Sequence, residues 1–525
     1  MVFTREVARD EKIFTNGGDD LIGVVNGADE ADGGSGFDTL FVNYVDATGP
    51  VVSGALSGNL TDGYSGIVTS PGRSVAYSGI ERLQLIGGAF NDDLRGGAGI
   101  DTFNGNGGAD TMAGAGGNDI YFVENAGDVV VELAGEGTDE IRTFLAVQNL
   151  AGTNVENMRA MSDIAHEFRG NESNNIVTGA AGRDTVYLQQ GGNDRVSGLA
   201  GNDTFFYGAT FTTADTVLGG DGIDGLILQG AYAMTLGTGT TSNITGVETI
   251  SLAPGHFTDW GDTAGQFYDY SFTTLNGNVA AGAVLKFNGF YLRAGEDFTF
   301  NGAAETDGKF ILLAGQGVDN LTGGNGNDIF AFGPDGRFGS TDVANGGAGY
   351  DSVYLRGDYA LDFTAASFGT MTSIESITLG SAAEIEYTAG GDGELDYDLV
   401  WDDAMLADNG SITVNGSGLG ANETMAFDAS DEAGGAFRMF AGAAADTLTG
   451  GGGGDLLYGG LGADTLRGNS GADTYRYQAS AESTAGAGNY DSILGFTHDV
   501  DKIDLSVIDA NTARAGNDAF VFIGT

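Results

Sequence analysis

The sequence GGAGIDTFNGNGGADTMAGAGGNDIYF, from Gly96 to Phe122, places an aspartate at every ninth position: Asp101, Asp110 and Asp119. A large apolar residue follows two positions after each aspartate, as Phe103 follows Asp101. Glycine at fixed offsets between these pairs indicates a turn that recurs with the same backbone conformation. The stretch therefore predicts a nine-residue unit, in which a turn is followed by a very short strand.

Two such units form one coil of a flattened spiral, and strands one coil apart pair in parallel about 4.8 Å from each other. The predicted interior positions are Leu94, Phe103, Met112 and Tyr121. Asp92 and Asp110 then lie on one edge, and Asp101 and Asp119 lie on the other. Like charges stacked along an edge require a cation. Carboxylate and turn carbonyl oxygens suit Ca²⁺, which accepts 6 to 8 oxygens, better than the stricter Mg²⁺.

Composition narrows the class of protein. The 525 residues carry a net charge of −52, which argues against nucleic acid and anionic membranes as partners. The absence of cysteine excludes disulfides and thiolate chemistry. The start, MVFTREVARDEKIF, has no apolar core of a Sec-type signal, and no apolar run reaches about 18 residues. We therefore expect no membrane insertion.

The repeats resemble the GGxGxDxUx nonapeptide of the repeats-in-toxin, or haemolysin-type calcium-binding, family, where U is a large apolar residue. Full matches are GGSGFDTLF (Gly33 to Phe41), GGDGIDGLI (Gly219 to Ile227), GGNGNDIFA (Gly323 to Ala331) and GGAGYDSVY (Gly346 to Tyr354). The last block places Leu448, Leu457, Leu466 and Tyr475 at the apolar position. The fold class predicted from the spacing and the resemblance is all-β, a parallel β-roll or β-helix solenoid with interspersed unliganded coils.

The residues predicted to bind multiple Ca²⁺ ions are aspartates and turn glycines. The aspartates are Asp19, Asp29, Asp38, Asp92, Asp101, Asp110, Asp119, Asp184, Asp194, Asp203, Asp215, Asp224, Asp319, Asp328, Asp342, Asp351, Asp446, Asp455, Asp464 and Asp473. The glycines are Gly96, Gly97, Gly99, Gly105, Gly107, Gly114, Gly116, Gly450, Gly451, Gly453, Gly459, Gly460 and Gly462. The sites at Asp29 and Asp342 are predicted to be weaker, because Ala31 and Ala344 are small for an interior position.

A longer period underlies the nonapeptides. A shift of 127 residues places Gly219 to Leu252 on Gly346 to Leu379, so that ITGVETISL falls on MTSIESITL. This indicates a tandem duplication. We expect an N-terminal roll region over 1–178, a first copy over 179–330, a second copy over 331–457, and final roll turns with a capping segment over 458–525.

The segment from Tyr490 to Gly524 is similar to the one that follows the calcium roll in serralysin-type metalloproteases and other type I secretion substrates. The shared residues are Asp491, Phe496, Asp501, Lys502, Ile503, Asp504 and Leu505. In that family the segment caps the roll and leads into a C-terminal export signal, and this resemblance implies secretion by the type I route.

No catalytic motif is found, so the chain is not predicted to be an enzyme. The pair His166 and Glu167 lacks the second histidine of HExxH, since Gly170 stands there, and GxSxG does not occur. Two other features are interpreted as structural. These are the cluster Trp401, Asp402 and Asp403, expected to be an acidic loop with a packing tryptophan, and the tripeptide Arg356 to Asp358, expected to be a coincidental RGD.

The predicted function is that of a secreted calcium-binding structural protein at a bacterial surface or in the extracellular medium. It is expected to fold and self-associate in calcium as part of a surface layer, matrix or adhesive coat, similar to surface-layer proteins of the repeats-in-toxin kind. The alternative is the noncatalytic calcium-binding portion of a type I secreted hydrolase or polysaccharide-modifying enzyme. A cell-surface polysaccharide bound along the sheet faces is a third candidate partner.

Overall fold

Each nine-residue repeat forms a turn followed by a strand of about three residues. In the opening stretch these strands are β11 (Asp93–Arg95), β12 (Thr102–Asn104) and β13 (Thr111–Ala113). Strands two repeats apart pair in parallel, with Phe103 opposite Tyr121 and Leu94 opposite Met112. The centre of each strand is buried; its neighbours are half-buried in β12 and β13, and Arg95 of β11 is exposed. The predicted roll, with two repeats to a coil, is confirmed.

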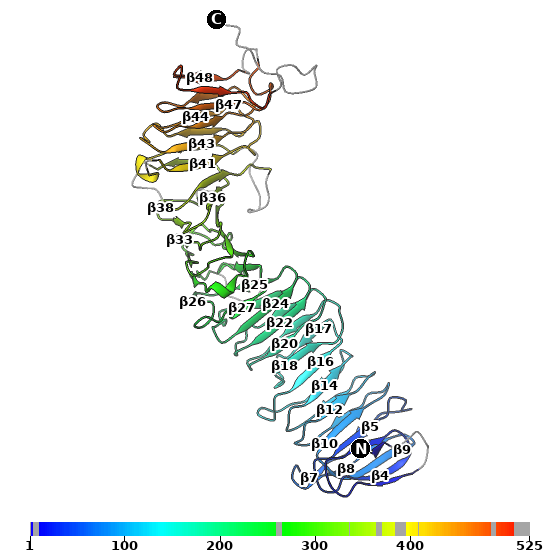
Figure 1. The fold of residues 1–525 in the computed structure, drawn as a ribbon. Helices are drawn as coiled ribbons and strands as arrows, with labels where there is room; N and C mark the ends of the chain where they lie inside the picture. Colours follow the sequence, from blue (N-terminus) through cyan, green and yellow to red (C-terminus); the bar gives the residue numbers. More distant parts are fainter. Residues whose placement is uncertain are drawn as a thin grey trace. The chain divides into compact units, whose positions relative to one another are not determined.

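The computed structural model describes residues 2–3, 10–258, 265–334, 337–363, 370–383, 395–407, 409–484 and 490–508. The chain divides into two compact units, Met1–Leu228 with Asn243–Val247, and Gln229–Ser242 with Glu248–Thr525. Within each unit successive coils stack in chain order (Figure 1). The described part is all-β apart from two short 3₁₀ turns, η1 (Asn276–Asn278) and η2 (Asp403–Met405).

The first unit contains two complete sheets and a series of parallel strands. The first sheet has the order β1 (Val2–Phe3), β3 (Leu21–Val24), β5 (Thr39–Asn43), β10 (Arg82–Ile86), β12, β14 (Ile120–Val123), β16 (Glu140–Thr143), β18 (Asn157–Ala160), β20 (Ile176–Thr178), β22 (Arg195–Ala200), β24 (Thr216–Asp221) and β27 (Ile244–Thr245). The second has the order β15 (Val129–Val130), β13, β11, β6 (Val52–Ser53), β8 (Gly63–Ser70), β9 (Arg73–Ile80), β4 (Ala28–Asp32) and β2 (Lys12–Phe14), with β7 (Ser57–Asn59) beside β8. The parallel series is β17 (Val147–Asn149), β19 (Glu167–Arg169), β21 (Thr185–Tyr187), β23 (Thr204–Tyr207) and β25 (Gly225–Leu228).

The second unit contains three parallel series. The longest is β28 (Thr249–Leu252), β30 (Val284–Asn288), β32 (Lys309–Leu313), β34 (Ile329–Phe332), β36 (Ser352–Leu355), β39 (Ser376–Leu379), β41 (Ser411–Asn415), β43 (Ala436–Phe440), β45 (Leu456–Tyr458), β47 (Thr474–Arg476) and β49 (Lys502–Asp504). The next is β26 (Tyr232–Thr235), β29 (Tyr270–Thr273), β31 (Phe298–Asn301), β33 (Asp319–Thr322), β35 (Val343–Asn345) and β38 (Thr370–Thr372). The last is β37 (Tyr359–Asp362), β40 (Tyr397–Val400), β42 (Met425–Asp428), β44 (Thr447–Thr449), β46 (Thr465–Arg467) and β48 (Ser492–Leu494).

The tandem duplication is visible in the second unit as matching elements that begin 127 residues apart. The strand β28 corresponds to β39, the turn η1 to η2, and β30 to β41. The domain limits at 178, 330 and 457 stay a proposal, because the compact units are defined by contacts and not by the repeat.

An antiparallel hairpin interrupts the parallel order in the first unit. The strands β8 and β9 pair antiparallel, and β8 is also antiparallel to β6. The connection Ser70, Pro71, Gly72, Arg73 explains the hairpin, because proline fixes its own φ and Gly72 adopts a φ of 82°. The nine-residue period does not predict this hairpin.

Candidate calcium-binding edges

The repeat aspartates form hydrogen-bonded ladders along the edges of the sheets. In the regular repeats each aspartate stands directly before a strand, and its Oδ1 accepts the backbone N–H of the equivalent residue one coil earlier. The N–H of Asp92 donates to Oδ1 of Asp110 at 2.8 Å, and the N–H of Asp101 donates to Oδ1 of Asp119 at 2.6 Å. The first pair lies on one edge and the second on the other, as the period of nine predicts.

The ladders continue beyond the nonapeptides. In the first unit, Glu81 accepts the N–H of Asp38, and Asp101 accepts the N–H of Leu83. From Asp101 the ladder before the first sheet continues through Asp119 and Asp139 to Glu156; there Asn175 Nδ2–H donates to the backbone oxygen of Glu156, and the ladder resumes from Asn175 through Asp194 to Asp215. Two shorter ladders contain Asp92, Asp110 and Asp128, and His166, Asp184, Asp203 and Asp224. In the second unit the ladders are Asp319 and Asp342; Asp328, Asp351 and Glu375; Asp446, Asp464 and Asp491; and Asp455, Asp473 and Asp501.

The predicted aspartates take these ladder positions with two exceptions near the start of the chain. Asp19 is exposed and accepts the N–H of Phe37, whereas its neighbour Asp20 donates to Asp38 and stands directly before β3. Asp29 lies within β4, where it accepts the N–H of Glu11.

Several ladder carboxylates have a second oxygen that is buried and has no hydrogen-bond partner. These include the Oδ2 atoms of Asp38, Asp110, Asp119, Asp194, Asp203, Asp351, Asp464 and Asp473. A buried carboxylate oxygen without a partner is costly, and stacked like charges add to the cost. Burial raises the pKa of Asp101 to about 7, of Asp119 to about 8 and of Asp455 to about 7. A cation with several oxygen ligands removes this penalty.

The first glycine of each regular turn makes room for the carboxylate of that turn. A Cβ on Gly96 would lie 2.0 Å from Asp101 Oδ2, and the same contact recurs for Gly105, Gly114, Gly450 and Gly459 at 1.9 to 2.3 Å. Real Cβ atoms essentially never approach another atom below 3.0 Å. The first glycine is therefore required by the position of the aspartate oxygen.

The other predicted glycines serve different purposes. Cβ atoms on Gly99, Gly453, Gly460 and Gly462 would collide with a backbone carbonyl oxygen of the preceding coil at 1.8 to 2.1 Å, so turn carbonyls stack along the same edges. Those on Gly97 and Gly451 would meet the side chains of Tyr64 and Glu432. Gly107 and Gly116 have no neighbour closer than 3.3 Å. Only part of the glycine pattern is therefore tied to the ladders.

Two coils next to the repeat blocks carry a phenylalanine at the ladder position. Phe310 donates its N–H to Asp328 Oδ1 over 2.6 Å, and Phe437 donates to Asp455 in the same way. Both phenylalanines are fully buried. These two coils continue the sheets without a carboxylate at that point; that they bind no ion stays a prediction.

Several ladder residues lie outside the predicted calcium-binding residues, among them Glu81, Asp139, Glu156, Asn175 and His166. The position of Glu81 could have been predicted from the sequence. The segment GIERLQL shares its glutamate with GVETISL and SIESITL, and Glu375, the glutamate of the last segment, also lies on a ladder. Asp139 keeps the pattern of an aspartate followed two positions later by an apolar residue, at a spacing of 20.

His166, Trp401, Asp402 and Arg356 all make contacts within the fold. His166 is buried beside Asp184, at 3.3 Å between Nδ1 and Oδ1. Trp401 is buried, and Asp402 caps η2 by accepting the N–H of Ala404. Arg356 is only 2% exposed, so the RGD tripeptide does not present its arginine. Asp403 of the same cluster is exposed, and its Oδ1 accepts the N–H of Ala433.

The comparison with known families agrees with the ladder geometry. A model of the RTX calcium-binding nonapeptide repeat matches residues 86–121, 167–191, 190–209, 311–335 and 440–475. The chain contains RTX calcium-binding repeats. Each matched segment includes ladder aspartates and their turn glycines, such as Asp101 with Gly96 and Asp455 with Gly450. No curated protein matches the chain.

The oxygen atoms present along the edges fit the metal that these repeats bind. Carboxylates with unpartnered oxygens and stacked turn carbonyls are hard donors, with no thiolate and no histidine pair. Such a donor set favours Ca²⁺. Among the described residues, no helix is long and apolar enough to cross a membrane.

Proposed function

We propose that the protein is a secreted bacterial structural protein that folds when it binds extracellular calcium and then self-associates in a surface layer, matrix or coat. The observation that carries the proposal is the set of edge ladders, because buried carboxylates with unpartnered oxygens stack along the edges in both units. RTX repeats are typical of secreted bacterial proteins, which supports an extracellular location.

Calcium binding and folding are coupled in this proposal. The ladder oxygens come together only when the coils stack, so the free energy of calcium binding contributes to folding. Extracellular calcium sites bind at roughly 10⁻⁴ to 10⁻³ M, whereas cytosolic free calcium is far below this range. The chain would then remain unfolded during export and fold outside the cell. The similarity of residues 490–508 to the capping segment of type I secretion substrates supports this route; residues 509–525 lie outside the described residues.

Self-association follows from charge neutralisation. A net charge of −52 keeps copies of the chain apart. Each calcium ion removes two negative charges, so about 20 ions would lower the net charge to roughly −12. Without cysteine for crosslinks, assembly would depend on the surface of the calcium-bound protein, and the sheet faces also offer room for a cell-surface polysaccharide.

The test combines circular dichroism with light scattering during a calcium titration. We expect little β-structure with excess chelator, a cooperative gain of β-structure at millimolar calcium, and increased scattering in the same range or just above it. Magnesium should be much less effective. A β-rich spectrum in chelator would contradict coupled folding. A monodisperse monomer in saturating calcium at high protein concentration would instead favour the noncatalytic portion of a secreted enzyme.

A further inference from the structure

The turn between β15 and β16 differs from the regular repeat. The pairing of Met112 with Val130 places Glu132 opposite Gly114, the first glycine of the turn one coil earlier. From Glu132 to Asp139 this turn is two residues longer than the turn from Gly114 to Asp119. It also lies between the matched segments 86–121 and 167–191. A glutamate therefore replaces the first glycine, which in regular turns makes room for a carboxylate.

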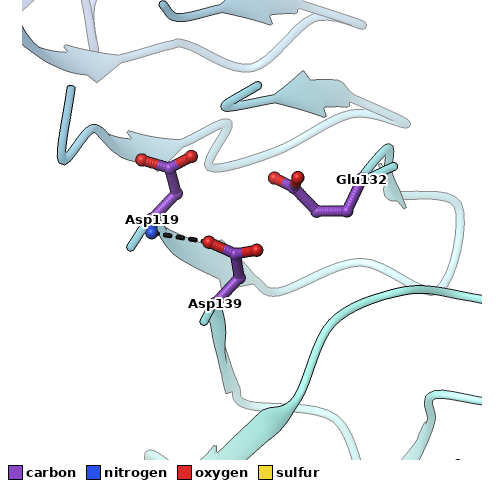
Figure 2. Close-up of side chains that lie close together, drawn as sticks. All are labelled: Asp119, Glu132 and Asp139. Atoms are coloured by element: carbon purple, nitrogen blue, oxygen red, sulfur yellow. Dashed lines mark hydrogen bonds between the residues drawn. The ribbon is translucent and has the colours of Figure 1, made fainter. Parts of the chain in front are cut away.

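Glu132 joins two ladder aspartates in a buried group of three carboxylates. One oxygen from each of Asp119, Glu132 and Asp139 lies within 4.8 Å of the others. Their exposed fractions are 1%, 6% and 1%. Figure 2 shows the Glu132 side chain extending toward the two aspartates, which are joined by the hydrogen bond from Asp119 N–H to Asp139 Oδ1 at 2.8 Å.

The orientation of Glu132 is fixed from the interior of the roll. The Tyr121 hydroxyl donates to Glu132 Oε1 and accepts the N–H of Gly114 at 2.7 Å. One Glu132 oxygen is thus held, and the other, Oε2, is buried without a partner. Asp119 Oδ2 is also buried without a partner. Two unpartnered oxygens of buried side chains in one cluster indicate a missing ligand.

We propose that Asp119, Glu132 and Asp139 bind one calcium ion, with Glu132 as a ligand from outside the nonapeptide motif. The proposal rests on the calcium-dependent function proposed above. Three carboxylates and no nitrogen or sulfur donor favour a hard cation. The flanking acidic groups Glu136 and Glu156 increase the negative charge at the site.

This site is expected to fill before the regular sites of the same edge. Calcium affinity increases with the number of charged ligands and with the rigidity of the site. Here three carboxylates converge, and Tyr121 restrains one of them, whereas two successive regular coils bring together two aspartates, such as Asp101 and Asp119. The ion at Glu132 would therefore order the end of the first run, Asp92 to Asp119, at lower calcium than the rest.

The test counts bound ions by native mass spectrometry of the full chain at defined free calcium. Glu132→Gln should carry one ion fewer than the wild type, and the first ion should be the one lost. Glu136→Gln is the matched control, because it removes the same charge from the same turn while its amide oxygen can still accept the N–H of Leu133. Equal ion counts for the two variants would overturn the proposal.

A second pair of variants applies if Glu132→Gln does not fold. Tyr121→Phe removes the hydroxyl that holds Glu132 but no carboxylate, and should weaken binding of the first ion by about tenfold. Tyr475→Phe is its control, since the Tyr475 hydroxyl accepts the N–H of Gly468 in the same arrangement. Equal binding by these two variants would also overturn the proposal. A wild-type chain that binds no calcium would instead contradict the proposed function itself.

Discussion

Two alanine substitutions in one turn should change stability in opposite directions. Gly105 and Gly107 both lie in the turn that ends at Asp110. A Cβ at position 105 would lie 2.0 Å from Asp110 Oδ2, whereas at position 107 the nearest atom, Ala89 Cα, is 3.6 Å away. Asp110 Oδ2 is one of the buried oxygens without a partner. Gly105→Ala must therefore displace the oxygen that is available to the ion by about 1 Å.

The magnitudes follow from these contacts. Overpacking costs about 1–3 kcal/mol, and a displaced ligand that weakens calcium about tenfold costs about 1.4 kcal/mol more. Gly105→Ala should thus lower the free energy of unfolding in calcium by about 2–4 kcal/mol. Gly107→Ala fits in the space, and should raise it by about 0.4–1 kcal/mol because alanine restricts the unfolded chain.

The assay is urea unfolding followed by circular dichroism at saturating calcium, with both variants and the wild type in parallel. The two proteins have the same composition, so the comparison isolates the position of the methyl group. If both variants shift stability in the same direction by similar amounts, the first glycine does not make room for a calcium ligand, and the assignment of Asp110 Oδ2 fails.

Further predictions follow from the same ladders. Asp110→Ala should raise the calcium midpoint in a circular dichroism titration more than Asp29→Ala, because Asp110 lies within an unbroken run; equal shifts would contradict the ranking. Ala115→Gly should increase the urea midpoint by the equivalent of about 1 kcal/mol, since Ala115 has a φ of 68°; a decrease would rule out strain there. Burial raises the pKa of Asp101 to about 7 and of Asp119 to about 8, so the folded chain binds these protons more tightly than the unfolded chain. In chelator, protonation of these two carboxylates stabilises the folded chain fully below about pH 4, and this stabilisation is lost as the pH rises through 7 to 8. The β-structure measured by circular dichroism should therefore increase on acidification. A loss of β-structure between pH 8 and 5 would contradict this. In calcium, protons compete with the ion, and the calcium midpoint should rise as the pH falls.

The regular part of the fold could be predicted because each repeat is locally complete. A period of nine with an apolar residue two positions after the aspartate determines the face of every strand, as the burial of Phe103 and Leu457 confirms. The alternation of edges followed from the same count, and Asp92 and Asp101 lie on different ladders as expected. The nine-residue period thus predicted both the buried face of each strand and the edge on which each aspartate lies.

The irregular part depends on contacts between coils, which a period does not encode. The Pro71–Gly72 turn of the β8–β9 hairpin is visible in the sequence, but the place of the hairpin beside β4 and β6 depends on tertiary packing. Glu132 lies in a turn of unusual length, and nothing in its immediate sequence indicates that it would reach Asp119.

The difference between regular and irregular turns also bears on how the roll can form. In a regular turn the carboxylate occupies the space above a glycine, and one coil supplies one aspartate to an edge. At Glu132 the glycine is replaced, and the turn itself supplies a second carboxylate. A run of identical turns has no preferred starting point, because each depends on its neighbours in the same way. The turn with the additional carboxylate of Glu132, at the end of a run, differs from the others and provides a starting point. Calcium would bind there first, and the regular coils would then stack against an ordered end.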